Sequence, residues 1–397
     1  MAGIYLHIPF CLSKCIYCGF YSNPKSFAQR GAVTDYISAL KGEIQRRRDF
    51  FSRSGSGENC KISTLYIGGG TPSLLSAQEL SGIKEALCGS FDFAPHAFTT
   101  QCCGEFEFTM EVNPNDITPE YAKVLKELGV NRISMGVQSF CNEHLIWMGR
   151  RHRSSEAVEA FNILRAAGFG NIGLDLIFGY PALTMEQWRD NIERLIELQP
   201  EHISAYQLSI DAGTELEKLC ESGAFSLPDE EICRGQYALL QELLGGAGYI
   251  QYEISNFARE GDFISRHNSN YWKRVPYMGL GPSAHSFVAD TREWNIADTE
   301  RYCNFYNGRE RSLFENIIES EHLSEKEIFN ETLMLGLRQS DGIEKGALSQ
   351  ELFNTIQPAL QRFIKEGIII EEVHPARYRI HPNSFFISDY IISSLFV

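Results

Sequence analysis

Three cysteines near the start of the chain have the spacing of a metal-binding group. Cys11, Cys15 and Cys18 fall in the pattern C-x3-C-x2-C. Thiolates are the usual protein ligands of [4Fe–4S] clusters, and three of them would occupy three of the four irons of a cube. The fourth iron would stay open, and an open metal position is typical of chemistry rather than of a structural site. A zinc site completed by His7 or a distant cysteine is the alternative that the spacing leaves open.

The remaining composition is that of an acidic, intracellular protein. The 397 residues include eleven cysteines, and 36 Lys and Arg stand against 51 Asp and Glu, a formal net charge of −15. An odd cysteine count in a long chain fits a disulfide framework poorly. We find neither signal-peptide features nor an apolar run of about 18 residues, so we expect a cytoplasmic protein without a transmembrane segment. The acidic charge argues against a nucleic-acid partner.

Short apolar runs alternate with helical patterns through the first half of the chain. This alternation predicts a parallel sheet with right-handed crossovers, and six such units give an α/β fold with a partial (β/α)6 barrel. The predicted strands are 4–8, 64–67, 108–112, 132–137, 172–178 and 202–210. The predicted helices are 76–87, 119–128, 155–167 and 185–198, with capping residues and glycines at several of their ends.

Polar or reactive residues lie near the ends of these strands. They are Cys11, the run Gly68-Gly69-Gly70-Thr71, Glu111, Gln138 and Asp175. In a βα barrel the chemistry gathers at the carboxyl ends of the strands, so we expect these residues to share one site. Asp175 lies between two leucines, and a buried carboxylate is unfavourable unless it is paired, which favours a functional role.

The pattern changes after the barrel, and we divide the chain into three parts. Residues 1–235 are the barrel, 236–320 a barrel extension whose aromatic segment lies on the rim, and 321–397 a C-terminal domain. In that domain we predict helices 324–336, 345–353 and 358–366 and a hairpin of strands 368–371 and 377–380. This order indicates a small helical, winged-helix-like domain. Because the chain is acidic, we interpret it as a packing domain rather than a DNA reader.

The cysteine loop reads Ile8-Pro9-Phe10-Cys11-x3-Cys15-x2-Cys18 and resembles the signature of the radical S-adenosylmethionine enzymes. More narrowly, nearly the whole chain resembles the oxygen-independent coproporphyrinogen III oxidase family. The resemblance implies a radical S-adenosylmethionine barrel with a [4Fe–4S] cluster, whose open iron is chelated by the amino and carboxylate groups of S-adenosylmethionine. An electron from the cluster then cleaves the sulfonium C–S bond and gives methionine and a 5′-deoxyadenosyl radical.

The resemblance also implies a set of cofactor-binding residues. The glycine loop matches the family loop that holds the amino group of the cofactor. Glu111 and Arg150 match residues at its methionyl end, as expected for an ammonium that needs acceptors and a carboxylate that suits an Arg fork. Alone, the loop could be a plain tight turn and Arg150 a solvated cation. The full set is Tyr5, Tyr17, Gly69, Gly70, Thr71, Glu111, Gln138, Arg150 and Asp175.

The other members of the set are matched to the nucleoside part of the cofactor. Gln138 and Asp175 match positions that hydrogen-bond the ribose hydroxyls. Tyr17 matches an aromatic residue that packs on the adenine, and Tyr5 matches a tyrosine that contacts the cofactor. Both tyrosines could instead be packing residues.

Two departures separate the chain from the oxidases. The position of the oxidases' fourth cysteine, two residues after the third, is Phe20 here. The chain also begins only ten residues before Cys11, without the N-terminal extension of the oxidases. Both features match instead the HemW-like branch of the family, whose members are regarded as haem chaperones.

A motif of that branch supplies candidate haem contacts. His267-Asn268-x2-Tyr271-Trp272 matches the pattern H-N-x-x-Y-W. Histidine is a natural haem-iron ligand, and Tyr and Trp can flank a flat macrocycle. The alternatives are a structural aromatic corner with His267 hydrogen-bonded to backbone, or haem ligation by His285 or another group. Segment 96–105, with Cys102 and Cys103, resembles an insertion, and we assign it no role.

The hypothesis is therefore an iron–sulfur protein that binds S-adenosylmethionine, carries haem as cargo and delivers it to an apo-haemoprotein acceptor. A reductant such as a flavodoxin is implied by the resemblance, and peripheral contact with a membrane is left open. The alternatives are a coproporphyrinogen III oxidase, a radical methyltransferase or haem-degrading relative, and a non-catalytic zinc scaffold.

Overall fold

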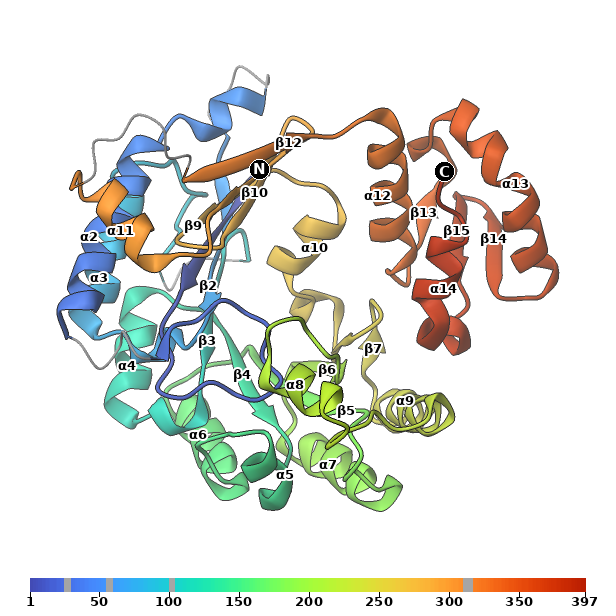
Figure 1. The fold of residues 1–397 in the computed structure, drawn as a ribbon, viewed down its shortest axis with the longest axis horizontal. Helices are drawn as coiled ribbons and strands as arrows, with labels where there is room; N and C mark the ends of the chain where they lie inside the picture. The colour runs from blue at the N-terminus through green and yellow to red at the C-terminus, as the bar shows by residue number, and fades with distance from the viewer. Residues whose placement is uncertain (25–29, 55–59, 100–103, 310–316) are drawn as a thin grey trace.

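The computed structural model describes residues 1–397 except 25–29, 55–59, 100–103 and 310–316 (Figure 1). Its largest element is a twelve-stranded sheet. In chain order the strands are β1 (Ala2–Ile8), β2 (Ile62–Gly69), β3 (Glu107–Val112), β4 (Arg132–Gln138), β5 (Ile172–Phe178), β6 (His202–Gln207), β7 (Ile250–Gln251), β8 (Asn256–Ala258), β9 (Tyr277–Leu280), β10 (His285–Val288), β11 (Thr291–Asn295) and β12 (Ile318–His322). Their order in the sheet is β12-β11-β10-β9-β1-β2-β3-β4-β5-β6-β8-β7.

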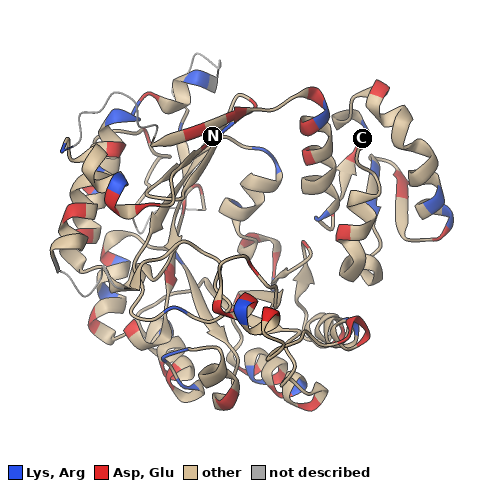
Figure 2. Cartoon of the chain, in the orientation of Figure 1, with Lys and Arg blue, Asp and Glu red and all other residues tan. Residues whose placement is uncertain are grey.

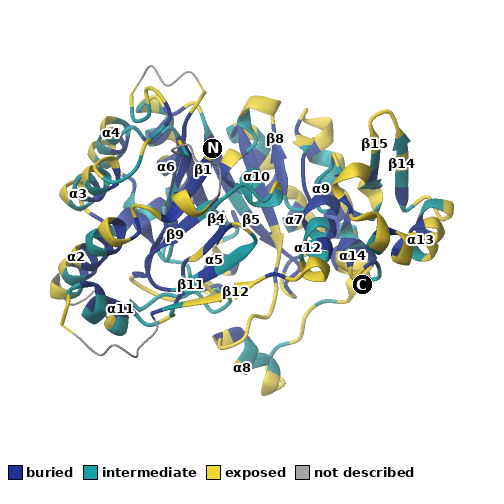
Figure 3. Ribbon diagram, turned by 90° about the horizontal axis from the view of Figure 1, so that it is seen from above, coloured by how far each residue is buried: buried dark blue, intermediate teal, exposed yellow. Residues whose placement is uncertain are grey.

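The six predicted strands are the parallel core of this sheet. Strands β1 to β6 are neighbours in chain order, and each pairs in parallel with the next. They are buried at the centre of the molecule (Figure 3), because both faces of a parallel sheet are covered by other elements. Within the described residues the sheet stays open, with β12 and β7 at its edges. The predicted α/β fold with a partial barrel is confirmed.

Helices cover the outer side of the parallel strands. They are α2 (Arg30–Arg46), α3 (Ala77–Cys88), α4 (Pro119–Leu128), α5 (Asn142–Trp147), α6 (Ser154–Ala166) and α7 (Met185–Leu198). The four helices predicted from periodicity match α3, α4, α6 and α7 within one residue at each end. Ser76 and Glu79 form a capping box at the start of α3, and Gly129 ends α4 in the left-handed region. Acidic and basic residues are interspersed on these outer helices (Figure 2).

The segment after the barrel extends the sheet at both edges. It follows α8 (Glu215–Glu221) and contains α9 (Glu230–Gly246), α10 (Arg266–Trp272) and α11 (Thr299–Tyr306). Strand β9 pairs in parallel with β1, and β10, β11 and β12 continue in antiparallel pairing, whereas β8 pairs antiparallel with β6.

A buried ionic network joins these added strands to α2. Arg47 donates to the carbonyl of Gly279 on β9 at 3.0 Å and to Glu293 on β11 at 3.0 Å. It also pairs with Glu43, whose side chain is fully buried and accepts from Asn295 and Tyr302. Because buried charges are stable only when paired, this network fixes β9 to β11 against the barrel.

The C-terminal part packs beside α10 and forms a small separate sheet. Its elements are α12 (Glu325–Leu337), β13 (Ile343–Glu344), α13 (Gln350–Lys365), β14 (Ile369–Val373), β15 (Ala376–Ile380) and α14 (Ser388–Ser393), and the strand order is β13-β15-β14. The predicted hairpin is confirmed. The prediction of two helices over 345–353 and 358–366 is wrong, because the single helix α13 covers residues 350–365 and residues 345–347 form a short 3-10 helix.

Continuous burial explains the single helix. Proline removes a backbone donor from a helix interior, and Pro358 lies inside α13. Phe353, Ile356, Leu360 and Phe363 are nevertheless all buried and follow one face of the helix, so their burial outweighs the break that proline favours. Across the described residues, no helix has the length and hydropathy needed to cross a membrane.

Candidate functional site

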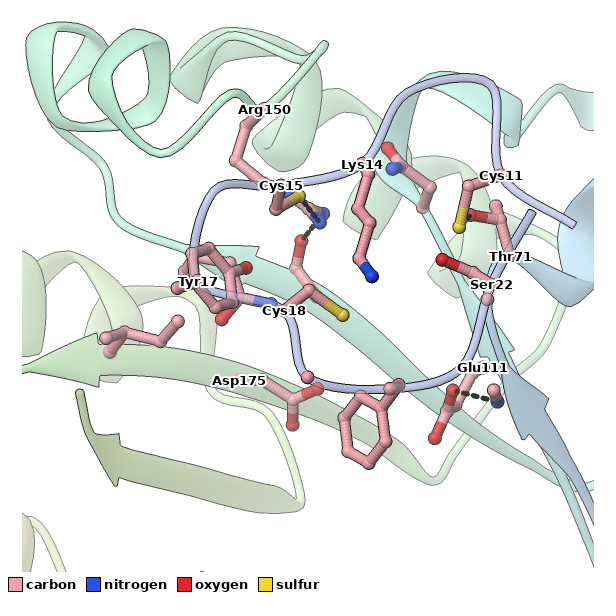
Figure 4. A pocket seen from close by; sticks show the side chains of 18 of the residues that line it. Cys11, Lys14, Cys15, Tyr17, Cys18, Ser22, Thr71, Glu111, Arg150 and Asp175 are labelled. Atoms are coloured by element: carbon pink, nitrogen blue, oxygen red, sulfur yellow. Dashed lines mark hydrogen bonds between the residues drawn. The ribbon is translucent and has the colours of Figure 1, made fainter. Parts of the chain in front are cut away.

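A cavity of about 390 Å³ lies at the carboxyl ends of the parallel strands (Figure 4). We call it the cluster cavity. It is lined by all three predicted cluster ligands and by all but one of the predicted cofactor-binding residues. These are Cys11, Cys15, Cys18, Tyr17, Gly69, Gly70, Thr71, Glu111, Gln138, Arg150 and Asp175. The fold thus brings together residues that are up to 164 positions apart, from Cys11 to Asp175.

The cysteine loop is held over this cavity by backbone hydrogen bonds to neighbouring elements. The amide of Asn23 donates to the carbonyl of Pro9 at 2.7 Å, which closes the loop after β1. Ile16 in the loop donates to Met148 at the end of α5 and accepts from Leu216 in α8. These bonds fix the backbone between the cysteines against two separate helices.

The three thiols lie in a setting that suits metal binding. The Thr71 hydroxyl donates to Cys11 Sγ at 3.4 Å, and Arg150 Nη1 donates to Cys15 Sγ at 3.7 Å. Burial raises the pKa of Cys18 to about 11, and the neighbouring Cys15 and Cys11 add to the rise. Bringing three thiolates together is therefore unfavourable without a cation, and a metal supplies the compensating charge.

The three thiols can be compared with the ligands of a single ion and with those of a cluster. Among the described residues, no three His, Cys, Asp or Glu side chains are grouped as ligands for a single ion. A structural zinc ion takes four ligands that converge on one point, whereas an iron–sulfur cube takes one thiolate on each separate iron. Three thiols that line one cavity could each bind a separate iron of a cube.

Glu111 is the buried carboxylate on one wall of the cavity. Its Oε1 accepts from the Tyr66 hydroxyl at 2.8 Å and its Oε2 accepts from the amide of Gly69 at 3.1 Å. Burial raises the pKa of Glu111 to about 7, and the nearby Asp175 carboxylate adds to the rise while Tyr66 lowers it. A cationic ligand in the cavity would favour the ionised form.

The glycine triplet at the end of β2 is required by close packing. A Cβ on Gly68 would lie 2.9 Å from the Glu111 carboxyl, and one on Gly70 would lie 2.5 Å from the carbonyl oxygen of Phe10. Gly69 has a φ of +108°, and a Cβ there would lie 2.7 Å from His7 Nδ1. The triplet therefore fits tightly between β1 and Glu111 while its backbone faces the cavity.

The cavity also contains buried polar atoms that lack partners within the described part of the chain. They are Gln138 Oε1, Asp175 Oδ1 and Arg150 Nε. Gln138 has a φ of +68° at a register shift between β4 and β5, a strained conformation that redirects its side chain. Arg150 Nη2 donates to the carbonyl of Gly136 at 2.6 Å, and burial raises the pKa of Asp175 to about 6. Such atoms are normally satisfied, so their presence fits a polar ligand.

The two predicted tyrosines differ in position. Tyr17 lines the cluster cavity beside Arg150, and burial raises its pKa. Tyr5 does not line this cavity; its hydroxyl lies 3.1 Å from His7 Nδ1 and faces a second cavity. Tyr5 is paired in register with Tyr66, which lines the cluster cavity, and the two rings lie 6.0 Å apart.

Several lining residues were missed by the sequence analysis. Tyr66, Ser134 and Tyr206 contribute to the cavity wall from β2, β4 and β6. Their polar side chains fall within otherwise apolar strands, and this interruption of the pattern is the signal that could have found them. Cys102 and Cys103 lie outside the described residues.

The second cavity, of about 760 Å³, lies on the other side of the cysteine loop. We call it the aromatic cavity. Gly19 and Phe20 line both cavities, so this segment of the loop separates them. Of the candidate haem contacts, Tyr271 and Trp272 line the aromatic cavity.

His267 does not line it. Its Nδ1 lies 2.8 Å from the Thr64 hydroxyl and its Nε2 lies 2.7 Å from the Tyr271 hydroxyl. Burial lowers the pKa of His267 to about 3. Both ring nitrogens are hydrogen-bonded, to side-chain hydroxyls rather than to the backbone that the structural alternative expected, and the bond to Thr64 links α10 to β2.

Comparisons with known proteins agree with this geometry. Residues 5–195 match the family model of the radical SAM superfamily. A protein named heme chaperone HemW from Bacillus subtilis is 32% identical, and the match covers 96% of each chain. The Lactococcus lactis protein of that name is 34% identical over 95% of this chain and 92% of its own, and the Escherichia coli one is 35% identical over 77% and 76%.

A solved structure shares the fold. The structure described as coproporphyrinogen III oxidase (HemN) from Escherichia coli, a radical SAM enzyme, covers 100% of this chain and 90% of its own. The TM-score is 0.81 at 22% sequence identity. This likeness extends from the parallel strands to the C-terminal part.

The tight packing of the glycine triplet can be tested by adding a methyl group. Gly69→Ala should lower the free energy of unfolding by about 1–3 kcal/mol, because it places a Cβ in the left-handed region and against His7. Gly245→Ala is the matched control, since a Cβ there meets nothing within 4 Å. Denaturant unfolding of both variants measures the effect, and equal stability of the two would contradict the packing account.

Proposed function

Because the chain belongs to the HemW-like family of the radical SAM superfamily, we propose that it is an iron–sulfur protein that binds haem and passes it to haemoproteins. The observation that carries the proposal is the 32% identity to a protein named heme chaperone over 96% of both chains. A match of that length extends far beyond residues 5–195, which match the superfamily model. The position of the oxidases' fourth cysteine is taken here by Phe20, which supports the chaperone over the oxidase.

In this proposal Cys11, Cys15 and Cys18 hold the [4Fe–4S] cluster in the cluster cavity. Lys14 and Arg150 line the same cavity and supply positive charge beside the thiolates. When bound, the cluster and S-adenosylmethionine supply one-electron chemistry at the sulfonium C–S bond. The chain's own residues position the cofactor and limit access of water.

We assign each part of the cofactor to one of the groups that line the cluster cavity. Glu111 accepts hydrogen bonds from the ammonium group, and Arg150 donates to the carboxylate. Gln138 Oε1 and Asp175 Oδ1 accept from the ribose hydroxyls, and Tyr17 packs on the adenine. Gly69, Gly70 and Thr71 form the wall beside the ammonium group. Tyr5 is left out of this set because its hydroxyl faces His7.

The binding partners follow from the same proposed function. Haem is the cargo, an apo-haemoprotein is the acceptor, and a small reductant of the flavodoxin type delivers electrons to the cluster. The alternative function, oxidative decarboxylation of coproporphyrinogen III, is favoured only by the shared fold.

Binding of S-adenosylmethionine should weaken as the pH falls below 7. The ammonium group is attracted only to the ionised form of Glu111, whose pKa is about 7. From that pKa, the fraction ionised at pH 6 is roughly eightfold lower than at pH 7.5, and the affinity should fall by the same factor. Equilibrium binding to the reconstituted chain measures this change. Glu111→Gln should bind weakly and remove most of the pH dependence, and a variant that keeps the wild-type profile would contradict the assigned role.

The proposed function is tested by haem transfer from the anaerobically reconstituted chain. The wild type should contain about four irons, bind haem and transfer it to a haem-free haemoprotein, without converting coproporphyrinogen III to protoporphyrinogen IX. Cys15→Ala should lose the cluster, whereas Cys220→Ala in α8 should keep it. Conversion of coproporphyrinogen III at an enzymatic rate would contradict the proposal, and a zinc-only product would contradict the cluster.

A further inference from the structure

The aromatic cavity has the dimensions and walls of a site for a flat macrocycle. Its volume of about 760 Å³ is almost twice that of the cluster cavity and lies within the usual range for organic ligands. Aromatic side chains come from the cysteine loop, α10, β9 and β11. They include Phe20, Tyr271, Trp272, Tyr277 and Trp294. Stacking on such rings favours a planar, apolar ligand.

Phe20 is the most unusual of these residues. Its side chain is 69% exposed, although it is large and apolar and sits in a loop held by backbone bonds on both sides. It lines the aromatic cavity and the cluster cavity together. An exposed aromatic residue at the mouth of a cavity is typical of a ligand-binding surface.

The histidines near this cavity differ in whether their ring nitrogens are hydrogen-bonded. His7 lies 2.7 Å from the carbonyl oxygen of Tyr21 through Nε2 and 3.1 Å from Tyr5 through Nδ1. The nitrogens of His267 are bonded as well. His285 is exposed, lines the cavity and stacks on Trp294 at a ring-centre distance of 5.8 Å. Within the described residues no hydrogen bond engages its imidazole, so it is the histidine here that can bind an iron without losing a partner.

Two arginines lie at the same cavity and share one carboxylate. Arg274 and Arg292 both pair with Glu331, which is carried by α12 of the C-terminal part. Arg274 also pairs with Asp290, and Arg292 with Glu321. The Glu331 side chain is only 12% exposed. A carboxylate held between two arginines marks a place where another carboxylate could bind.

We propose that haem binds in the aromatic cavity, with its iron on the imidazole of His285 and its propionates directed at Arg274 and Arg292. This inference rests on the proposed function. Trp294 packs on the imidazole of His285, the macrocycle packs on Phe20, and the propionates compete with Glu331 for the two arginines. Haem and the cluster then lie on opposite sides of the same loop segment, Gly19 and Phe20.

The test compares His285→Ala with His322→Ala. Both histidines are exposed and lie on strands that flank β11, but His322 does not line the aromatic cavity. Ferric haem is titrated into the anaerobically reconstituted chain and followed by absorption and electron paramagnetic resonance. The wild type and His322→Ala should show histidine ligation. His285→Ala should lose that spectrum and bind haem at least about tenfold more weakly, with unchanged iron content and affinity for S-adenosylmethionine.

A second variant tests the propionate positions. Glu331→Gln removes the competing carboxylate charge, so it should lower the haem dissociation constant. An unchanged or raised constant would overturn the assignment of the two arginines.

Two further outcomes separate the inference from the proposed function. A His285→Ala variant that keeps the wild-type spectrum and affinity would overturn the haem site and leave the chaperone function standing. A wild-type chain that binds no haem would overturn both.

Discussion

The close approach of the glycine triplet to the first strand and its loop is the constraint on which the site depends. The amide of Gly70 donates to the carbonyl of Ile8, and that of Thr71 donates to the carbonyl of Phe10, both at 2.7 Å. These bonds extend the pairing of β1 and β2 beyond the strands and direct the chain that follows β1 over the cavity. They form only because no side chain stands between the two backbones. The positions of Cys11 and Glu111 both follow from this contact.

The same loop gives the molecule two cavities rather than one. Its cysteines face the ends of the parallel strands, whereas Phe20 reaches both sides. The aromatic cavity exists because β9 to β11 continue the sheet beyond β1, and these strands are fixed to α2 through Arg47. Helix α12 closes its far side with Glu331 and Leu335. The C-terminal part thereby contributes directly to a ligand-sized cavity, which a packing role alone does not explain.

The sequence allowed the parallel core and most of the cluster cavity to be predicted, for definite physical reasons. Buried strands have an apolar pattern, and polar residues at their carboxyl ends must meet at one edge of a parallel sheet. Gln138 and Asp175 were found in this way. The single helix α13 was missed because the local effect of Pro358 was visible in the sequence, whereas the burial that outweighs it was not.

Which of the two neighbouring cavities a side chain lines was also not predictable. Tyr5 precedes the cysteine loop by only a few residues, yet it faces the aromatic cavity. The pattern around His267 identified Tyr271 and Trp272 as cavity residues, but hydrogen bonds with Thr64 and Tyr271 occupy both ring nitrogens of the histidine itself. Contacts between residues some 200 positions apart decide such cases, and no local spacing encodes them.

The central claim is that two ligands occupy two cavities with the cysteine loop between them. The most direct measurement is a crystal structure of the anaerobically reconstituted chain with S-adenosylmethionine and haem. Our account predicts a cluster on Cys11, Cys15 and Cys18 in the cluster cavity and haem iron on His285 in the aromatic cavity. A porphyrin inside the cluster cavity, beside Glu111 and Asp175, or an iron bound to His267, would contradict it.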